Sequence, residues 1–133
     1  MTMSITDLCL LVDDMDRSIA FYRDAMGLKV KRLDTGFAEF HAGPTTLALW
    51  LRNDIAANLD APGLRKPGTG IMAAVRLADP EAVDAEVARL EGSGITMSHA
   101  PQAWPWNAYA AYFNDPDDHL WEIYSWMGAP RTL

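Results

Sequence analysis

The stretch that decides the fold reads LCLLVDDM at residues 8–15, and a second stretch, IMAAVRLADP at residues 71–80, repeats its pattern. Each is an apolar run that meets acidic residues and leads into an amphipathic segment, a glycine and another apolar run. Asp14 and Asp79 are equivalent positions and lie 65 residues apart. The repeat indicates one structural unit present twice, and folds of this kind place their chemistry in the cleft between the copies.

Composition limits the classes of function. The chain has 133 residues, of which 50% are hydrophobic and 22% charged, as expected for one globular domain with a sizeable core. A formal charge of −7 argues against nucleic acid as a partner and mildly favours cationic ligands, although it also fits a merely acidic surface. No apolar stretch approaches the roughly 20 residues that span a bilayer, so we expect no membrane partner.

Cysteine content and the first residues bear on location. Cys9 is the only cysteine, which excludes an internal disulfide and fits a reducing compartment. The sequence MTMS at residues 1–4 has no basic region followed by an apolar one, as a signal peptide would. We therefore expect a cytoplasmic protein.

Periodicity and turn residues predict the order strand, helix, strand, strand, strand in each half. The expected strands are 5–12, 28–33, 37–41 and 45–51 in the first half, and 71–77, 95–99, 108–113 and 119–126 in the second. Asp13 or Asp14 would cap the first helix and Gly27 would end it. Asp79 and Pro80 would begin the second helix, and residues 101–106 would form a loop.

The domain organisation follows from this order. We expect a single domain over 1–133, made of a first module at 4–52, a linker at 53–69, a second module at 70–126 and a tail at 127–133. The linker is rich in glycine and proline, with one helical turn near 54–58. Neither module has enough strands to close alone, so the two share a core or pair between chains.

Two longer motifs carry a family resemblance. VDDMDRSIAFY at residues 12–22 is followed by Gly27 and Leu28, and YFNDPDDHLWEI occupies residues 112–123. Together they resemble the vicinal oxygen chelate superfamily, which includes glyoxalases, bleomycin-resistance proteins and extradiol dioxygenases. The resemblance implies an α+β fold in which two βαβββ modules form a curved sheet with a cleft. Asp118 stands where the turn usually has glycine, and Asp tolerates the left-handed backbone such a turn requires.

The resemblance also implies where a metal would bind. Catalytic members hold a divalent ion with four side chains, one from the first and one from the last strand of each module. Those positions fall on Asp7, Ala48, Met72 and Glu122. Ala48 has no donor atom, and the thioether of Met72 is a poor ligand for the metals these enzymes use. We therefore expect no metal and no other cofactor.

Strand alternation indicates which side chains share a face with those positions. The opposite faces are apolar and would pack beneath the helices. Trp50 and Tyr124 would offer flat walls to a planar ligand, although Trp50 could instead lie in a dimer seam or fill space. Trp104 and Trp106 would cover the cleft or, alternatively, cap the core or a subunit interface.

Charged residues on these faces leave several roles open. Arg76 could pair with Glu122 or Asp7, which we favour, or bind an anionic substrate. Glu122 could act as a general base if burial raises its pKa. Glu39 and His41 share a strand face and could transfer a proton, or simply be solvated. Cys9 is expected to be an inert thiol in a buried strand.

These observations favour a metal-free homodimer that resembles the bleomycin-resistance branch, linked to antibiotic resistance, and sequesters a small aromatic or cationic molecule. The predicted ligand-binding residues are Asp7, Trp50, Arg76, Trp104, Trp106, Glu122 and Tyr124. The alternative is a glyoxalase-like lyase, isomerase or dioxygenase that uses an unusual metal set or an acid/base pair, such as Glu122 with His41 or Asp7. A third possibility is an accessory module with no small ligand.

Overall fold

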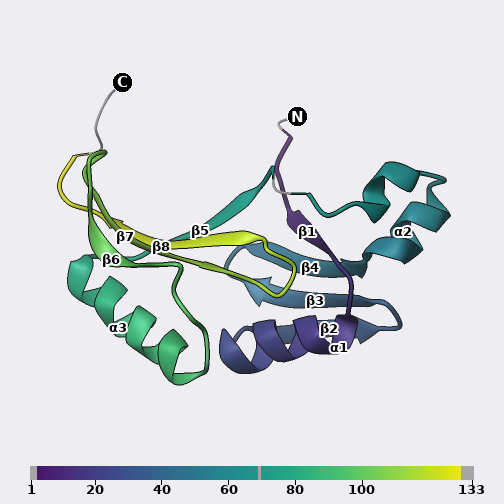
Figure 1. The fold of residues 1–133 in the computed structure, drawn as a ribbon, viewed down its shortest axis with the longest axis horizontal. Helices are drawn as coiled ribbons and strands as arrows, with labels where there is room; N and C mark the ends of the chain where they lie inside the picture. Colours follow the sequence, from purple (N-terminus) through teal and green to yellow (C-terminus); the bar gives the residue numbers. More distant parts are fainter. Residues whose placement is uncertain (1–2, 69, 130–133) are drawn as a thin grey trace. The chain divides into compact units, whose positions relative to one another are not determined.

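A computed structural model describes residues 3–68 and 70–129. The chain divides into two compact units, Met1–Pro67 and Gly68–Leu133, each with its own sheet and helices (Figure 1). Parts of the predicted segments fall on residues 1–2, 69 and 130–133. These parts are the start of the domain, the last residue of the linker 53–69 and the end of the tail 127–133, and they lie outside the described residues.

The first unit consists of one four-stranded sheet and its helices. Its elements are β1 (Asp7–Val12), α1 (Met15–Ile19), the π-helical segment η1 (Ala20–Ala25), β2 (Lys29–Asp34), β3 (Phe37–Ala42), β4 (Thr45–Leu51), α2 (Arg52–Asn58) and the 3-10 helix η2 (Pro62–Arg65). The strand order is β1-β4-β3-β2, in which β1 runs parallel to β4 and the other pairs are antiparallel.

The second unit repeats this topology. Its elements are β5 (Met72–Arg76), α3 (Pro80–Gly92), β6 (His99–Trp104), β7 (Ala108–Asn114) and β8 (Leu120–Trp126). The strand order is β5-β8-β7-β6, again with one parallel pair, β5 and β8. The predicted α+β class with two βαβββ modules is confirmed.

Local sequence explains where the helices begin and end. The carboxylate of Asp14 accepts from the backbone N–H of Arg17 at 3.0 Å, and that of Asp79 accepts from Ala82 at 2.8 Å. Both are N-caps, which satisfy backbone donors that a helix start leaves unpaired. After η1 the chain turns at Gly27, whose φ of +80° suits a residue without Cβ.

One face of each sheet is apolar and carries the core. In the first unit Val12, Phe40 and Leu49 are buried beneath the helical segment that contains Tyr22. In the second unit Phe113 and Ile123 are buried on the face that α3 covers with Val83, Val87 and Leu90. Burial of these side chains leaves the opposite, mixed face of each sheet to carry polar and aromatic groups.

A buried arginine fastens the end of the first sheet to the segment that follows it. Arg52 is 5% exposed, and its Nε donates to the carboxylate of Asp13 at 3.0 Å. Its terminal nitrogens donate to the carbonyls of Leu11, Leu64 and Lys66. The linker is therefore more structured than the single helical turn predicted, because it contains both α2 and η2.

The prediction of a loop at 101–106 was wrong. Residues His99–Trp104 form β6, which pairs with β7, so the strand predicted at 95–99 begins where it was expected to end. The register shifts between His99 and Gln102. Pro101 lies within that shift, where a residue without a backbone N–H is tolerated, and its loop-like sequence hid the strand.

The turn between β7 and β8 is held by a buried aspartate. The carboxylate of Asp115 accepts from the backbone N–H groups of Asp117 and His119, and it contacts the His119 ring nitrogen at 2.8 Å. Asp118 adopts the left-handed conformation predicted for it, with φ of +66°. None of the helices in the described ranges is long and apolar enough to cross a membrane.

Candidate functional site

The mixed face of the second sheet has a cross-strand row that contains a buried carboxylate. Ala74 on β5 lies opposite Glu122 on β8, which lies opposite Tyr112 on β7, which lies opposite His99 on β6. Glu122 is 9% exposed, whereas an unpaired carboxylate normally stays in water. The row therefore places one acid among aromatic side chains.

The partner of that acid is a phenol. The hydroxyl of Tyr112 donates a hydrogen bond to Oε2 of Glu122. Loss of solvent around Tyr112 raises the pKa of the phenol well above its usual value, and the hydrogen bond to Glu122 and the negative charge of that carboxylate raise it further. Tyr112 thus stays protonated at neutral pH and stabilises the carboxylate by donation.

Aromatic rings surround this pair on β6 and the turn that follows it. We call His99, Trp104, Trp106 and Tyr112 the aromatic cluster. The Trp104 ring stands edge-on to Tyr112 at 5.7 Å and to His99 at 5.8 Å, and it stacks on Trp106 at 5.1 Å with an interplanar angle of 15°. Trp106 is 41% exposed. The cluster therefore offers an open indole surface that Tyr112 connects to the acid.

The Trp104 ring is fixed by more than ring contacts. Its Nε1–H donates to the carbonyl of Ala110 on β7 at 3.0 Å, so the ring lies over the sheet. This bond satisfies the polar edge of the indole and leaves its faces for stacking. Trp104 and Trp106, predicted as a pair, do lie together.

The other predicted residues of the second unit lie one row further along. Arg76 is exposed at the end of β5 and lies opposite Tyr124 on β8, and the Tyr124 ring contacts Trp126 edge-on at 5.5 Å. The favoured ion pair between Arg76 and Glu122 is not formed, since Glu122 accepts from Tyr112 instead. Within the described part of the second unit Arg76 has no salt bridge, which leaves its guanidinium in solvent.

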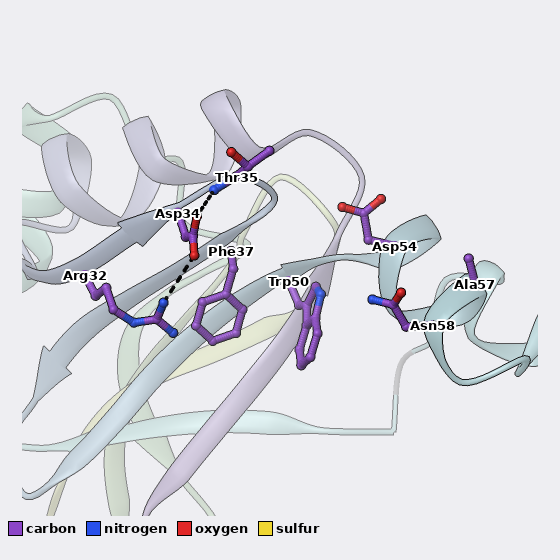
Figure 2. Close-up of a pocket in the computed structure, with 8 residues that line it drawn as sticks. All are labelled: Arg32, Asp34, Thr35, Phe37, Trp50, Asp54, Ala57 and Asn58. Atoms are coloured by element: carbon purple, nitrogen blue, oxygen red, sulfur yellow. Dashed lines mark hydrogen bonds and ion pairs between the residues drawn. The ribbon is translucent and has the colours of Figure 1, made fainter.

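Two predicted residues of the first unit lie at opposite ends of its mixed face. Asp7 is exposed at the start of β1 and accepts from the hydroxyl of Thr6. Trp50 on β4 contacts the Phe37 ring edge-on at 5.2 Å and lines a pocket of about 550 Å³ (Figure 2). The indole of Trp50 is therefore part of a cavity wall.

Of the two interpretations left open for Glu39 and His41, the structure favours the one without proton transfer between them. Glu39 accepts from Nε of Arg32 at 2.6 Å, so its partner is a guanidinium rather than His41. His41 is exposed at the end of β3 and lies opposite Thr46. The guanidinium of Arg32 thus takes the place beside Glu39 that His41 would need for proton transfer.

The expectation that Cys9 is buried was wrong. The strand was predicted to bury the thiol, but β1 alternates and Cys9 lies exposed on the mixed face. Partial loss of solvent around the thiol raises its pKa, and the nearby Asp7 carboxylate raises it further. Cys9 is thus largely a thiol at neutral pH, which makes it a poor nucleophile or metal ligand.

The residues at the four implied metal positions do not fit a divalent ion. Each unit supplies one carboxylate there, Asp7 in the first and Glu122 in the second, while Ala48 and Met72 supply no hard donor. Among the described residues no three His, Cys, Asp or Glu side chains gather closely enough to hold a metal. Chelation of this kind needs three or more such ligands.

Sequence reasoning missed Tyr112 and His99, although a signal for Tyr112 was present. Residues 115–119 connect β7 to β8, and antiparallel pairing outward from them places Tyr112 opposite Glu122. Counting along the two strands would have found the pair. His99 could not be found in this way, because the register shift in β6 displaces it. The arrangement as a whole can stack a flat ring and accept a hydrogen bond or positive charge.

Comparisons with known proteins agree with the fold described above. The sequence profile of the Glyoxalase/Bleomycin resistance protein/Dioxygenase superfamily matches residues 4–123. A crystal structure of a glyoxalase/bleomycin resistance protein/dioxygenase from Nocardioides is 33% identical, with a TM-score of 0.91 over 100% of this chain and 90% of that one.

Two further proteins are similar to this chain over most of its length. A lactoylglutathione lyase from Agrobacterium tumefaciens is 28% identical, with a TM-score of 0.74 and 92% of each chain covered. The uncharacterized protein YraH of Bacillus subtilis (strain 168) is 29% identical over 128 residues, which are 94% of this chain and 100% of YraH. With the repeated βαβββ units and a profile match over most of its length, the chain belongs to the Glyoxalase/Bleomycin resistance protein/Dioxygenase superfamily.

Proposed function

We propose that the protein binds a small, flat aromatic cation without a metal, and that the second unit provides the binding surface. The observation that carries this proposal is the buried Glu122 carboxylate, held by Tyr112 beside the stacked indoles of Trp104 and Trp106. Cations bind favourably to indole faces, and the contribution grows when water is excluded. A carboxylate beside those faces would select positive charge over negative.

The chemistry of the metal positions supports binding over metal-assisted catalysis. Two of the four positions hold Ala48 and Met72, which cannot replace a carboxylate or imidazole ligand. The formal charge of −7 also favours the approach of a cation over that of an anion. Sequestration needs only affinity, and the aromatic cluster can supply it.

Matched aromatic probes test the proposal. Protein treated with EDTA is titrated calorimetrically with N-methylacridinium, and separately with anthracene-9-carboxylate, which has the same ring system and the opposite charge. We expect the cation to bind and the anion to bind at least tenfold more weakly. Equal affinities, or no binding of either probe, would contradict the proposal.

Variants assign the binding to the second unit. Glu122→Gln keeps the shape of the acid and removes its charge, and we expect it to weaken N-methylacridinium binding about fivefold or more. Glu81→Gln is the control, because Glu81 is exposed in the first turn of α3 and its replacement removes the same charge elsewhere. Trp106→Ala removes an exposed ring, so it should weaken binding of the cation with little change in the stability of the protein.

A second candidate function is a glyoxalase-like lyase, favoured by the similarity to the lactoylglutathione lyase from Agrobacterium tumefaciens. In that case Glu122 would act as the base and Tyr112 would keep it oriented. The assay is whether the protein forms or consumes lactoylglutathione, with Glu122→Gln as the inactive control. Turnover that Glu122→Gln abolishes would replace the binding proposal by this one.

We also propose that the protein is a homodimer, because neither module's sheet closes on itself, and that it is cytoplasmic, because a single cysteine fits a reducing compartment. Sedimentation equilibrium should then give twice the chain mass of 14.7 kDa. A mass of a single chain at micromolar concentration would contradict the dimer.

A further inference from the structure

The first unit has a pocket of its own, separate in sequence from the aromatic cluster. Its volume of about 550 Å³ lies within the roughly 300–1,000 Å³ of small-molecule sites. It is lined by the β2–β3 hairpin, the end of β4 and α2 (Figure 2). The side chains that line the pocket include those of Arg32, Asp34, Phe37, Trp50, Asp54 and Asn58.

One wall of the pocket is aromatic. The rings of Phe37 and Trp50 stand edge-on at 5.2 Å, and the Arg32 guanidinium lies 4.8 Å from the centre of the Phe37 ring. That arginine occupies the Phe37 face, whereas the Trp50 side chain stands between Phe37 and α2 (Figure 2). Trp50 is therefore the ring that a flat ligand could contact.

The positive charge in the pocket is already neutralised. Arg32 binds Glu39 at 2.6 Å and contacts Asp34 at 3.5 Å. Asp34 in turn accepts from the backbone N–H of Thr35. One guanidinium between two carboxylates leaves this side of the pocket with no positive charge to attract an anion.

The opposite wall offers acceptors that nothing else uses. Asp54 and Asn58 lie four residues apart on α2 and therefore share one helix face, which borders the pocket (Figure 2). Neither side chain forms a hydrogen bond or ion pair with another residue that the structure describes. A carboxylate and an amide, free beside an indole, form a site for a hydrogen-bond donor with positive charge.

The β2–β3 turn approaches the carboxylate of Asp54 closely. Gly36, in the β2–β3 turn, is buried with φ of +70°, and a Cβ there would lie 2.5 Å from Oδ2 of Asp54. The carbonyl of Gly36 accepts from the backbone N–H of Leu51 at 3.0 Å, which ties the turn to the end of β4. A glycine at this position lets the turn approach Asp54 closely.

We propose that this pocket binds a small organic cation, with its amidinium or ammonium group on Asp54 and Asn58 and its flat apolar part against Trp50. The inference goes beyond the proposed function, because every residue involved belongs to the first unit and none is in the aromatic cluster. It assigns a second ligand class, a compact hydrogen-bonding cation rather than an extended ring system.

The probe is benzamidinium, compared with benzamide, which has nearly the same shape and no charge. Titration of ¹⁵N-labelled protein should shift the Trp50 indole signal and the backbone signals of residues 54–58. Benzamide should bind at least fivefold more weakly. Equal binding of the two compounds, or shifts confined to Trp104 and Trp106, would overturn the inference.

A pair of charge-matched variants isolates the carboxylate. Asp54→Asn should weaken benzamidinium binding about fivefold, whereas Asp16→Asn, at an exposed residue of α1, should leave it unchanged. Equal effects of the two variants would overturn the inference, since only general charge would then matter. N-Methylacridinium affinity, measured on Asp54→Asn, should stay at the wild-type value, which separates failure of this site from failure of the proposed function.

Discussion

Equivalent rows of the two units carry different chemistry. The row Cys9, Ala48, Glu39 and Arg32 crosses the first sheet, and the row Ala74, Glu122, Tyr112 and His99 crosses the second. In the first row the acid is neutralised by a guanidinium on the next strand. In the second the acid is buried and held by a neutral phenol, and no ion pair to it forms among the described residues.

The difference shows how one architecture can support two kinds of surface. An acid paired with arginine has little attraction left for a ligand, so the first unit offers its free carboxylate elsewhere, on α2. An acid that accepts a hydrogen bond from a neutral group has no positive charge beside it, so the second unit can present it at the row itself. The stacked indoles of Trp104 and Trp106 lie with the second row, next to Tyr112.

The largest effect we expect comes from Arg52→Ala, because Arg52 fastens the end of the first sheet and the described part of the second unit has no buried arginine. Three carbonyls lose their donor, and each buried polar group left unsatisfied costs about 1–3 kcal/mol, so we expect the free energy of unfolding to fall by about 3 kcal/mol or more. Hydrogen exchange should rise mainly in residues 5–67. Arg65→Ala, at an exposed arginine bonded to Asn53, is the control. An equal rise in both units would contradict a stabilising role of Arg52 confined to the first unit.

The next effect tests the second row. Tyr112→Phe removes the hydroxyl that donates to Glu122, and hydrogen bonds to charged groups contribute about 1.5–3 kcal/mol. We expect urea unfolding at neutral pH to show a loss in that range. Tyr109→Phe removes a hydroxyl bonded to Asp84 at the surface and should lose less. Equal losses would show that burial of the row does not matter.

The same pair predicts a dependence on alkaline pH. Desolvation raises the pKa of folded Tyr112 above the value of about 10 in an unfolded chain. The folded state holds this proton more tightly, so the stabilisation is complete below about pH 10 and is lost as the pH rises above it. The stability difference between wild type and Tyr112→Phe should shrink from about pH 9 to about pH 11. A constant difference would contradict the raised pKa.

The smallest effect belongs to the first row. Glu39→Gln removes the carboxylate that accepts from Arg32, whose side chain is 52% exposed. Pairs of this kind contribute about 0.2–1 kcal/mol and are screened by salt. We expect a loss in that range which disappears in concentrated sodium chloride. A loss as large as that of Tyr112→Phe would remove the contrast between the rows.

Much of the fold could be predicted from local sequence. The caps at Asp14 and Asp79, the turns at Gly27 and Asp118, and the apolar alternation are all short-range signals, and the structure confirms them. β6 escaped because Pro101 at a register shift reads as a loop. The pairing of Tyr112 with Glu122 was available from the turn between their strands.

The rest depends on contacts between distant segments. Arg52 is buried because Leu11, Leu64 and Lys66 bring carbonyls to it, and nothing near residue 52 in the sequence shows this. The pocket beside Trp50 needs α2 to lie against the β2–β3 turn, which brings Asp54 next to Gly36. Strand alternation could name Trp50, but it could not name the residues facing it.

Indole signals of the five tryptophans in ¹⁵N spectra test the central claim most directly, with N-methylacridinium added to protein in EDTA. The account predicts large shifts for Trp104 and Trp106 and none for Trp121, which is buried against Phe113 on the other face of the sheet. Unchanged Trp104 and Trp106 signals, or shifts that appear only after a divalent metal replaces EDTA, would contradict it.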